Sequence, residues 1–131
     1  GNKIAIVTGG PREVAEAAMV LFEADAIFSN EFVYEAGIFT GAVRVSVSPR
    51  LKGDIVRGLA ARWGVSKEDI LAFGDGLMDV PLLAEASVRM GINSNGALRD
   101  HVDFEPRDYV HARQWLLDKG ALHETKADKK D

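Results

Sequence analysis

The feature that most constrains this chain is the alternation of short apolar runs with segments of helical periodicity. Residues 4–7 form a β-branched run that we expect to be a strand buried on both faces. Residues 12–22 then repeat apolar side chains at helical spacing, which predicts a helix. The same alternation continues along the chain, with strands expected at 26–28, 70–73 and 88–90, and helices at 51–63, 78–86 and 109–117. This pattern predicts an α/β fold with an open, mainly parallel, Rossmann-like sheet flanked by helices.

One segment departs from that alternation. Residues 32–34, 38–40 and 43–47 are short strand-like runs separated by Gly37 and Gly41. We expect them to form a small β-hairpin insertion. In the first helix, the apolar residues that recur at helical spacing are Val14, Ala17, Ala18, Leu21 and Phe22.

Composition excludes several classes of function. The chain has 16 Lys and Arg against 20 Asp and Glu, a net charge of -4, so it lacks the basic excess of a nucleic-acid binder. It has no cysteine, which excludes disulfides, thiol catalysis and cysteine-ligated metals. No apolar stretch is long enough for a membrane helix, and the start does not resemble a signal peptide, so we expect a cytoplasmic protein. We expect one domain over residues 1–120 and a disordered polar tail over 121–131.

Two glycine-containing turns follow predicted strands. Thr8, Gly9 and Gly10 offer a hydroxyl and unhindered N–H groups that can hold a phosphate, although a tight turn that needs glycine explains them equally well. Asp75 and Asp79 follow the strand at 70–73 and can bind a hard cation such as Mg²⁺. The alternative is that Asp75 caps the next helix and that Asp79 lies in its solvated first turn, where the helix dipole favours an acid.

Lys52 is the third candidate. It opens the predicted helix at 51–63, where a cation is unfavourable because the helix N-terminus carries positive partial charge. This unfavourable position is evidence for a functional role of Lys52. When Lys52 is considered without the other motifs, however, a solvated surface lysine is the simpler interpretation.

Taken in order, these motifs resemble three of the four motifs of the haloacid dehalogenase superfamily, in its phosphoserine phosphatase branch. The segment Val7–Thr8–Gly9–Gly10 resembles the second motif, Lys52–Gly53–Asp54–Ile55 the third, and Phe73–Gly74–Asp75–Gly76 the fourth. Asn30 and the hairpin resemble the segment after the second motif. The resemblance implies an α/β fold of this superfamily over nearly all of residues 3–117.

The resemblance also implies a Mg²⁺-dependent phosphomonoester hydrolase that forms an aspartyl-phosphate. Thr8 and the N–H of Gly9 would then bind phosphoryl oxygens, and Lys52 would offset negative charge. Asp75 would ligate Mg²⁺, and Asp79 would orient Lys52 or the metal-bound waters. The substrate would be a small phosphorylated metabolite.

Two departures from the family pattern bear on activity. Met78 stands where the branch usually has a polar amide, and a thioether cannot make the same hydrogen bonds. The first motif, a strand ending in Asp-x-Asp-x-Thr, does not occur in the 131 residues. The nucleophile and the helical cap are therefore expected upstream of Gly1.

In the family's sheet, the missing strand would lie between the strands at 4–7 and 70–73. Its absence leaves two unpaired strand edges, for which there are three outcomes. A segment elsewhere fills the gap, a second copy fills it, or the two strands pair directly.

Three functions follow as hypotheses. The first is a phosphatase core that is inactive alone, and the second is a non-catalytic binding or self-assembling module. The third, a dinucleotide-binding oxidoreductase, rests on the turn at 8–10 but lacks the further glycines of that fingerprint.

Overall fold

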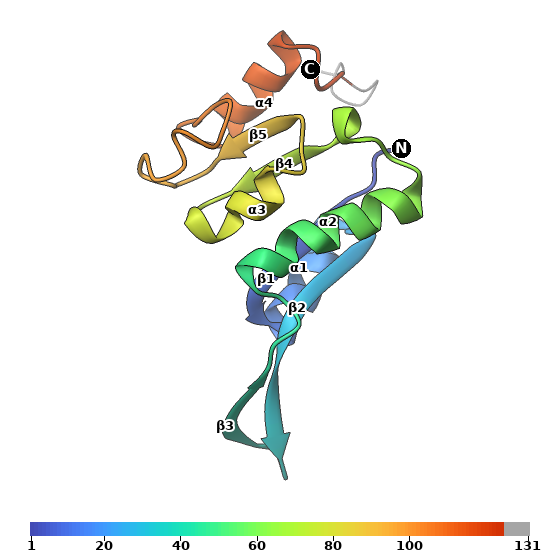
Figure 1. Ribbon diagram of the computed structural model, residues 1–131, viewed down its shortest axis with the longest axis vertical. Coiled ribbons are helices and arrows are strands. Elements are labelled where there is room, and N and C mark those ends of the chain that lie inside the picture. The colour runs from blue at the N-terminus through green and yellow to red at the C-terminus, as the bar shows by residue number, and fades with distance from the viewer. Residues whose placement is uncertain (125–131) are drawn as a thin grey trace. The chain divides into compact units, whose positions relative to one another are not determined.

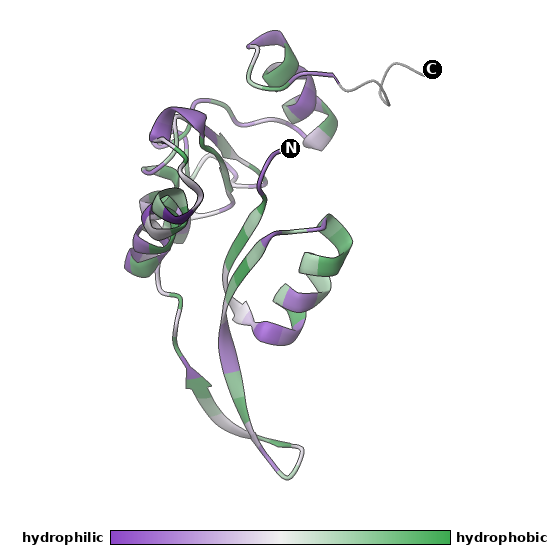
Figure 2. Ribbon diagram, turned by 90° about the vertical axis from the view of Figure 1, so that its right-hand side faces the viewer, coloured by the Kyte–Doolittle hydropathy of each residue, from purple (hydrophilic) through white to green (hydrophobic). Residues whose placement is uncertain are grey.

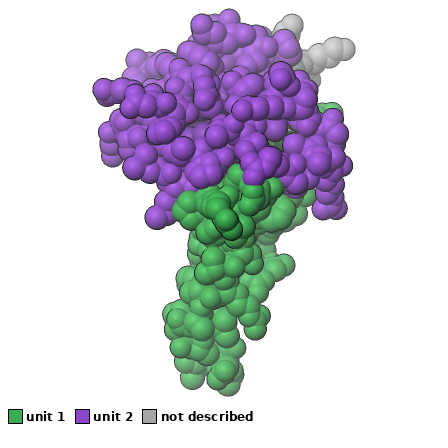
Figure 3. Space-filling model, in the orientation of Figure 1, with its two compact units in different colours: residues 1–55 green, residues 56–131 purple. Residues whose placement is uncertain are grey.

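The computed structural model describes residues 1–124, so the last part of the predicted tail, residues 125–131, lies outside the described residues. The chain divides into two compact units, residues 1–55 and 56–131 (Figure 3). In the part of the chain that the structure describes, no helix has the length and apolar character that crossing a membrane requires.

The first unit contains a three-stranded sheet with one helix packed on it (Figure 1). Its elements are β1 (Ala5–Pro11), α1 (Arg12–Phe22), β2 (Ala26–Glu35), β3 (Ile38–Arg44) and the start of α2 (Pro49–Trp63). Strands β1 and β2 run parallel, with Ile6 opposite Ile27, whereas β2 and β3 form an antiparallel hairpin. The predicted hairpin is therefore confirmed, and its far end extends beyond α1 (Figures 1 and 2).

The second unit contains a two-stranded parallel sheet. After the rest of α2 come a 3₁₀ turn (Lys67–Asp69), β4 (Leu71–Gly74), a second 3₁₀ turn (Leu77–Asp79), α3 (Val80–Leu83), β5 (Val88–Gly91) and α4 (Tyr109–Asp118). The predicted strands and the last helix are confirmed within a residue. The helix predicted at 78–86 is much shorter, because its first turn is 3₁₀ and Pro81 stands at its N-terminus.

Apolar side chains on both sides of the short sheet form two buried clusters in the second unit. One consists of Ala72, Leu83, Ala86 and Leu98. The other consists of Met90, Ile92, Ala112 and Leu116, against which Phe104 and Trp115 pack with their rings stacked at 5.1 Å. Together they hold α3 and α4 to the strands and so fix the loop that follows β4.

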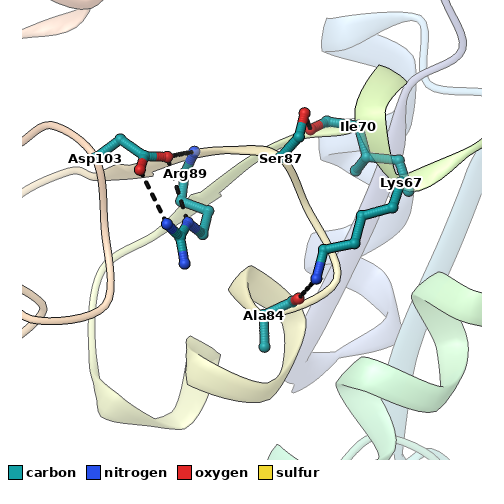
Figure 4. Close-up of polar contacts among 6 residues, drawn as sticks. All are labelled: Lys67, Ile70, Ala84, Ser87, Arg89 and Asp103. Carbon is teal, nitrogen blue, oxygen red and sulfur yellow. Dashed lines mark hydrogen bonds and ion pairs between the residues drawn. The ribbon is translucent and has the colours of Figure 1, made fainter.

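Polar contacts brace the connections around β4 and β5 (Figure 4). Lys67 donates to the carbonyl of Ala84 at the end of α3, 2.7 Å away, and Ser87 donates to the carbonyl of Glu68. The Asp103 carboxylate accepts hydrogen bonds from the backbone N–H of Arg89 and from its guanidinium. Because the anion is favoured by these bonds, chiefly those from the Arg89 side chain, the pKa of Asp103 lies below its ordinary value.

The predicted burial of the first unit is wrong in part. Ile4 is 44% exposed and Ile6 and Val7 are half-buried, so this strand is not buried on both faces. On α1, two of the apolar residues at helical spacing, Val14 and Leu21, are 62% and 75% exposed.

The contact between α1 and its sheet instead uses a small side chain. Ala15, which is 1% exposed, is the buried residue of the helix, because a small residue lets a helix approach a sheet closely. The C-terminal part of α1 consists of apolar residues, and its ribbon is green in Figure 2. Phe22 at that end is 60% exposed.

Strands β1 and β4 belong to different sheets. Each of them pairs with one neighbour within its own unit, β1 with β2 and β4 with β5. The three outcomes expected for the missing strand stay predictions.

Candidate functional site

The first candidate loop lies near the end of β1. The strand continues through the predicted turn to Pro11, but its register with β2 shifts between Val7 and Pro11, so the residues between them form an irregularity. The N–H of Gly10 donates to Thr8 Oγ1 over 3.0 Å. The Thr8 hydroxyl thereby accepts one bond and keeps its own proton for donation to a ligand.

A side chain at Gly10 would be crowded by Thr8. A Cβ at this position would lie 3.2 Å from Thr8 Oγ1, so the Thr8 side chain would have to shift by a few tenths of an ångström. Gly9 is exposed, and a Cβ there would lie 3.9 Å from the Asn30 side chain. The phosphate-binding interpretation of these glycines and the tight-turn interpretation both stay predictions.

Asn30, on β2, holds this loop in place. Its side chain is 7% exposed and makes four hydrogen bonds. Nδ2 donates to the carbonyls of Gly9 and Val47, both at 3.0 Å, and Oδ1 accepts from the N–H groups of Ser46 and Val47, both at 2.8 Å. One buried amide thus joins the loop after β1 to the segment that leads into α2.

Lys52 lies in the first turns of α2. The helix begins at Pro49, two residues before the predicted start, and the Ser48 hydroxyl accepts a bond of 3.4 Å from the N–H of Leu51. The N–H of Lys52 donates to the carbonyl of Ser48 at 3.0 Å. Lys52 is half-buried, and its assignment as a ligand-binding or a solvated surface lysine stays a prediction. The bond to Ser48 anchors the backbone of Lys52, which lies five residues after Val47, the residue that Asn30 binds.

The second candidate loop follows β4. The Asp79 carboxylate is 9% exposed, and its Oδ2 accepts a hydrogen bond of 2.9 Å from the N–H of Asp75. A Cβ at Gly74 would lie 2.7 Å from the Cβ of Asp79, which no real structure tolerates without movement. Glycine at 74 therefore lets Asp79 fold back against the strand, and Asp79 in turn fixes the backbone of Asp75.

The alternative that Asp75 caps the next helix and Asp79 lies in its solvated first turn does not hold, because Asp75 is not an N-cap and Asp79 is buried. Gly76 is the N-cap of the 3₁₀ turn, and Asp79, at the N-cap position of α3, makes no capping bond with its side chain. Asp75 is exposed at the carboxyl end of β4. Its carboxylate stands where ligands bind in open α/β sheets.

The donor set for a metal is partial in the described residues. Within residues 1–124, no group of three or more His, Asp and Glu side chains could hold a metal ion. Mg²⁺ in proteins is often held by one or two carboxylates, with water and substrate phosphate completing its shell. The exposed carboxylate of Asp75 fits one such ligand, and Met78, which is 69% exposed, offers no oxygen.

The structure therefore assembles the predicted residues in two groups. Thr8 and Gly9 are connected through Asn30 to the segment before Lys52, and Asp75 is connected directly to Asp79. Sequence reasoning missed the role of Asn30 as the residue that joins the first group. The available signal was a single amide inside an otherwise mostly apolar strand.

Comparison with known proteins identifies the family. A family model for haloacid dehalogenase-like hydrolases matches residues 1–84. The chain belongs to the haloacid dehalogenase-like hydrolases. This membership gives no support to the dinucleotide-binding alternative.

Within the family, the chain is similar to phosphoserine phosphatases. It is 33% identical to phosphoserine phosphatase SerB2 of Mycobacterium tuberculosis over 104 residues, which is 79% of this chain and 25% of that protein. It is 28% identical to phosphoserine phosphatase of Methanocaldococcus jannaschii over 111 residues, 82% of this chain and 53% of that protein. The chain thus spans between a quarter and about half of these relatives.

Solved structures show the same fold. A substrate-bound phosphoserine phosphatase complex superposes with a TM-score of 0.79 at 23% identity, covering 89% of this chain and 55% of that one. A probable phosphoserine phosphatase from Vibrio cholerae superposes with a TM-score of 0.77 at 23% identity, covering 94% of this chain and 40% of that one. The predicted α/β fold of this superfamily is confirmed.

Proposed function

We propose that this chain carries the phosphate-binding and metal-binding part of a phosphoserine phosphatase-like phosphomonoester hydrolase. The observation that carries the proposal is the loop after β4, in which a buried Asp79 holds the backbone that presents the exposed Asp75. A carboxylate fixed in this way at a strand end suits a divalent cation and its phosphate ligand. The substrate class is a small phosphorylated metabolite.

The phosphate is bound by Thr8, Gly9 and Lys52 in this proposal. The Thr8 hydroxyl is oriented by the bond from Gly10 and has a proton to donate, and Gly9 offers an exposed backbone N–H. The ammonium of Lys52 offsets the charge of the phosphoryl group. The support for this assignment is the Asn30 amide, which holds both Gly9 and the segment before α2.

Mg²⁺ is the proposed cofactor, and when bound it supplies charge neutralisation of a phosphoryl oxygen. Asp75 is the residue of this chain that would hold it. Asp79 acts on Asp75 through the backbone bond, so it is a positioning residue.

The nucleophile must come from outside these 131 residues, because they contain no Asp-x-Asp-x-Thr. Strand β1 is at the edge of its sheet and β4 is one of only two strands in its own, so each can accept a further strand. We propose that another segment of polypeptide supplies the nucleophile, and that this segment or a second copy of the chain pairs with the open strand edges. The 131 residues alone are then catalytically inactive.

The test is an assay of the purified chain with phosphoserine and with a generic aryl phosphate, with and without Mg²⁺. The expected result is no turnover, together with a rise in melting temperature when Mg²⁺ and inorganic phosphate are added. The rise should disappear in Asp75→Asn and persist in Asp69→Asn, an exposed acid outside the site. Mg²⁺-dependent turnover that Asp75→Asn abolishes would contradict the inactivity, and no ligand-dependent shift would contradict the site.

A non-catalytic module is the second candidate. It is favoured by the exposed Met78 in place of a polar amide and by the absent first motif. Sedimentation distinguishes the two, because self-assembly without any response to phosphate or Mg²⁺ supports the module. A monomer that responds to both ligands supports the phosphatase part.

A further inference from the structure

The loop between β5 and α4, orange in Figure 1, contains an unusually shaped turn at Asn95 and Gly96. The N–H of Ala97 donates to the carbonyl of Ser94 at 2.9 Å, which closes the turn. Asn95 has a φ of 51° and Gly96 a φ of 81°. Positive φ at both central positions is the pattern of a type I′ turn, in which Asn followed by Gly is strongly preferred.

The residues around this turn are firmly held, whereas its tip is open. Ser94 is 7% exposed and donates to the Glu105 carboxylate, and Leu98 is fully buried. Asn95 is exposed, and within residues 1–124 neither its side chain nor the N–H of Gly96 makes a hydrogen bond. In the described part of the chain, no hydrogen bond therefore holds either the side-chain amide of Asn95 or the next backbone nitrogen, and Gly96 is partly exposed.

We infer that Asn95 is a site of spontaneous deamidation. The Gly96 nitrogen loses its proton to solvent and attacks Cγ of Asn95, so that a new C–N bond closes a five-membered succinimide. The bond from Cγ to the side-chain nitrogen breaks, and ammonia leaves. Water then opens the ring at either carbonyl, which produces aspartate or its β-linked isomer without any oxidant or reductant.

Two features of Gly96 favour the attack. Glycine has no Cβ, so nothing shields its nitrogen from the neighbouring Cγ. The Arg99 guanidinium also lies beside Gly96, because a Cβ built there would be 3.3 Å from Arg99 Nη2. A nearby cation stabilises the anionic nitrogen that attacks, since opposite charge favours the ionised form.

Two other asparagines serve as internal references. Asn93 is also exposed with a positive φ of 53°, but Ser94 follows it, and the side chain of Ser94 is buried and held by Glu105. Asn30 is locked by four hydrogen bonds and is buried. Both should react far more slowly than Asn95.

The product changes the loop in charge and in length. Asn95 and Glu105 line the same surface hollow of about 250 Å³, so deamidation adds a second carboxylate to it. The β-linked isomer inserts an extra backbone atom, which the closed turn between Ser94 and Ala97 does not accommodate.

The experiment is incubation of the purified chain at mildly alkaline pH, followed by peptide mapping with mass spectrometry. Asn95 should convert about tenfold faster than Asn93, a difference of ~1.4 kcal/mol in activation free energy. Conversion should slow at mildly acidic pH, because the attacking nitrogen must lose a proton. Arg99→Gln should slow Asn95 by about threefold, equivalent to half a pKa unit in the acidity of the attacking N–H, and leave Asn93 unchanged.

The comparison of Asn95 with Asn93 within the unmodified chain needs no variant and decides the proposal by itself. Equal rates at the two positions, or conversion of Asn95 that does not depend on pH, would overturn it. If Arg99→Gln does not fold, Arg99→Lys, which keeps the positive charge, replaces it and should retain the fast conversion.

Discussion

The irregular segment Thr8–Gly10 at the end of β1, called here the loop after β1, and the loop after β4 both belong to parallel strand ends and both contain glycines. The two segments are stabilised in different ways. The loop after β4 is held from within, because the Asp79 carboxylate binds the N–H of Asp75 four residues earlier. The loop after β1 has one bond of its own, from Gly10 to Thr8, and is otherwise held by Asn30, 21 residues from Gly9.

This difference separates a self-contained loop from one that depends on the rest of its unit. Asp79 and Gly74 form a local structure that a short segment of sequence specifies. The geometry of Thr8 and Gly9 requires that β2 and residues 46–47 are already in place. Substitutions in the loop after β4 should therefore disturb only that loop. The loop after β1 should also be disturbed by substitutions that are distant in sequence.

The largest effect is expected from Asn30→Ala. It leaves two carbonyls and two N–H groups without their partner, at about 1–3 kcal/mol for each that stays unsatisfied, so we expect a loss of ~3 kcal/mol in unfolding free energy. Hydrogen exchange should show fast exchange at the Ser46 and Val47 amides and unchanged protection of Met90 in β5.

The control is Asn2→Ala, an exposed residue, for which a change within ~0.5 kcal/mol is expected. If Met90 lost as much protection as Ser46 and Val47 in Asn30→Ala, the conclusion that Asn30 stabilises only the first unit would be contradicted.

Gly74→Ala should have the next largest effect. The new Cβ would meet the Cβ of Asp79 at 2.7 Å and the Leu83 Cδ1 at 3.1 Å, so we expect a loss of ~1–3 kcal/mol by overpacking. Denaturant unfolding measures this loss of unfolding free energy.

Gly76→Ala is the matched control, since Gly76 is extended with a φ of -157° and a Cβ there meets nothing within 4 Å. Similar losses in both variants would show that the close approach does not matter.

Thr8→Val should have a smaller effect. Valine has nearly the shape of threonine but no oxygen, so the Gly10 N–H loses its acceptor at a net cost of ~1 kcal/mol. Exchange of the Gly10 amide should accelerate in Thr8→Val and remain slow in Thr8→Ser. Identical exchange in the two variants would mean that the hydroxyl does not hold this loop.

The smallest effect is expected from Asp103→Asn, which should change how the stability of the second unit depends on acid pH. The pKa of Asp103 is depressed in the folded chain, so its contribution is present above the ordinary value of 3.8 and is lost as the pH falls through the folded pKa. Asp103 is partly exposed, which weakens the contribution. A chemical-shift titration of the β5 amides should show less acid-induced loosening in Asp103→Asn than in the unmodified chain. The same loosening in both would contradict this role of Asp103.

Much of the fold was predictable because strand and helix periodicity are local properties of the chain. The strand at 70–73 and the Asp75 turn were found within a residue of their observed positions. The helix at 78–86 was overestimated, because the apolar spacing there does not reveal a 3₁₀ start.

The parts that could not be predicted depend on contacts distant in sequence. The spacing of Val14 and Leu21 predicted the helix α1, but the sheet decides which face of that helix packs, and the packed face uses Ala15. Asn30 was associated only with a family resemblance, because nothing near it in sequence identifies its four partners. The metal role of Asp75 stays a prediction.

The hydrogen bonds of Asn30 also limit the order in which the first unit can fold. Gly9 and Val47 lie 38 residues apart along the chain and meet on one side chain that is distant in sequence from both. Closing such long loops takes conformational entropy, so contacts of this kind form late and slow the reaction. During refolding, the Thr8 turn should gain its final shape only after the hairpin has been made, which places maturation of this ligand site among the last events.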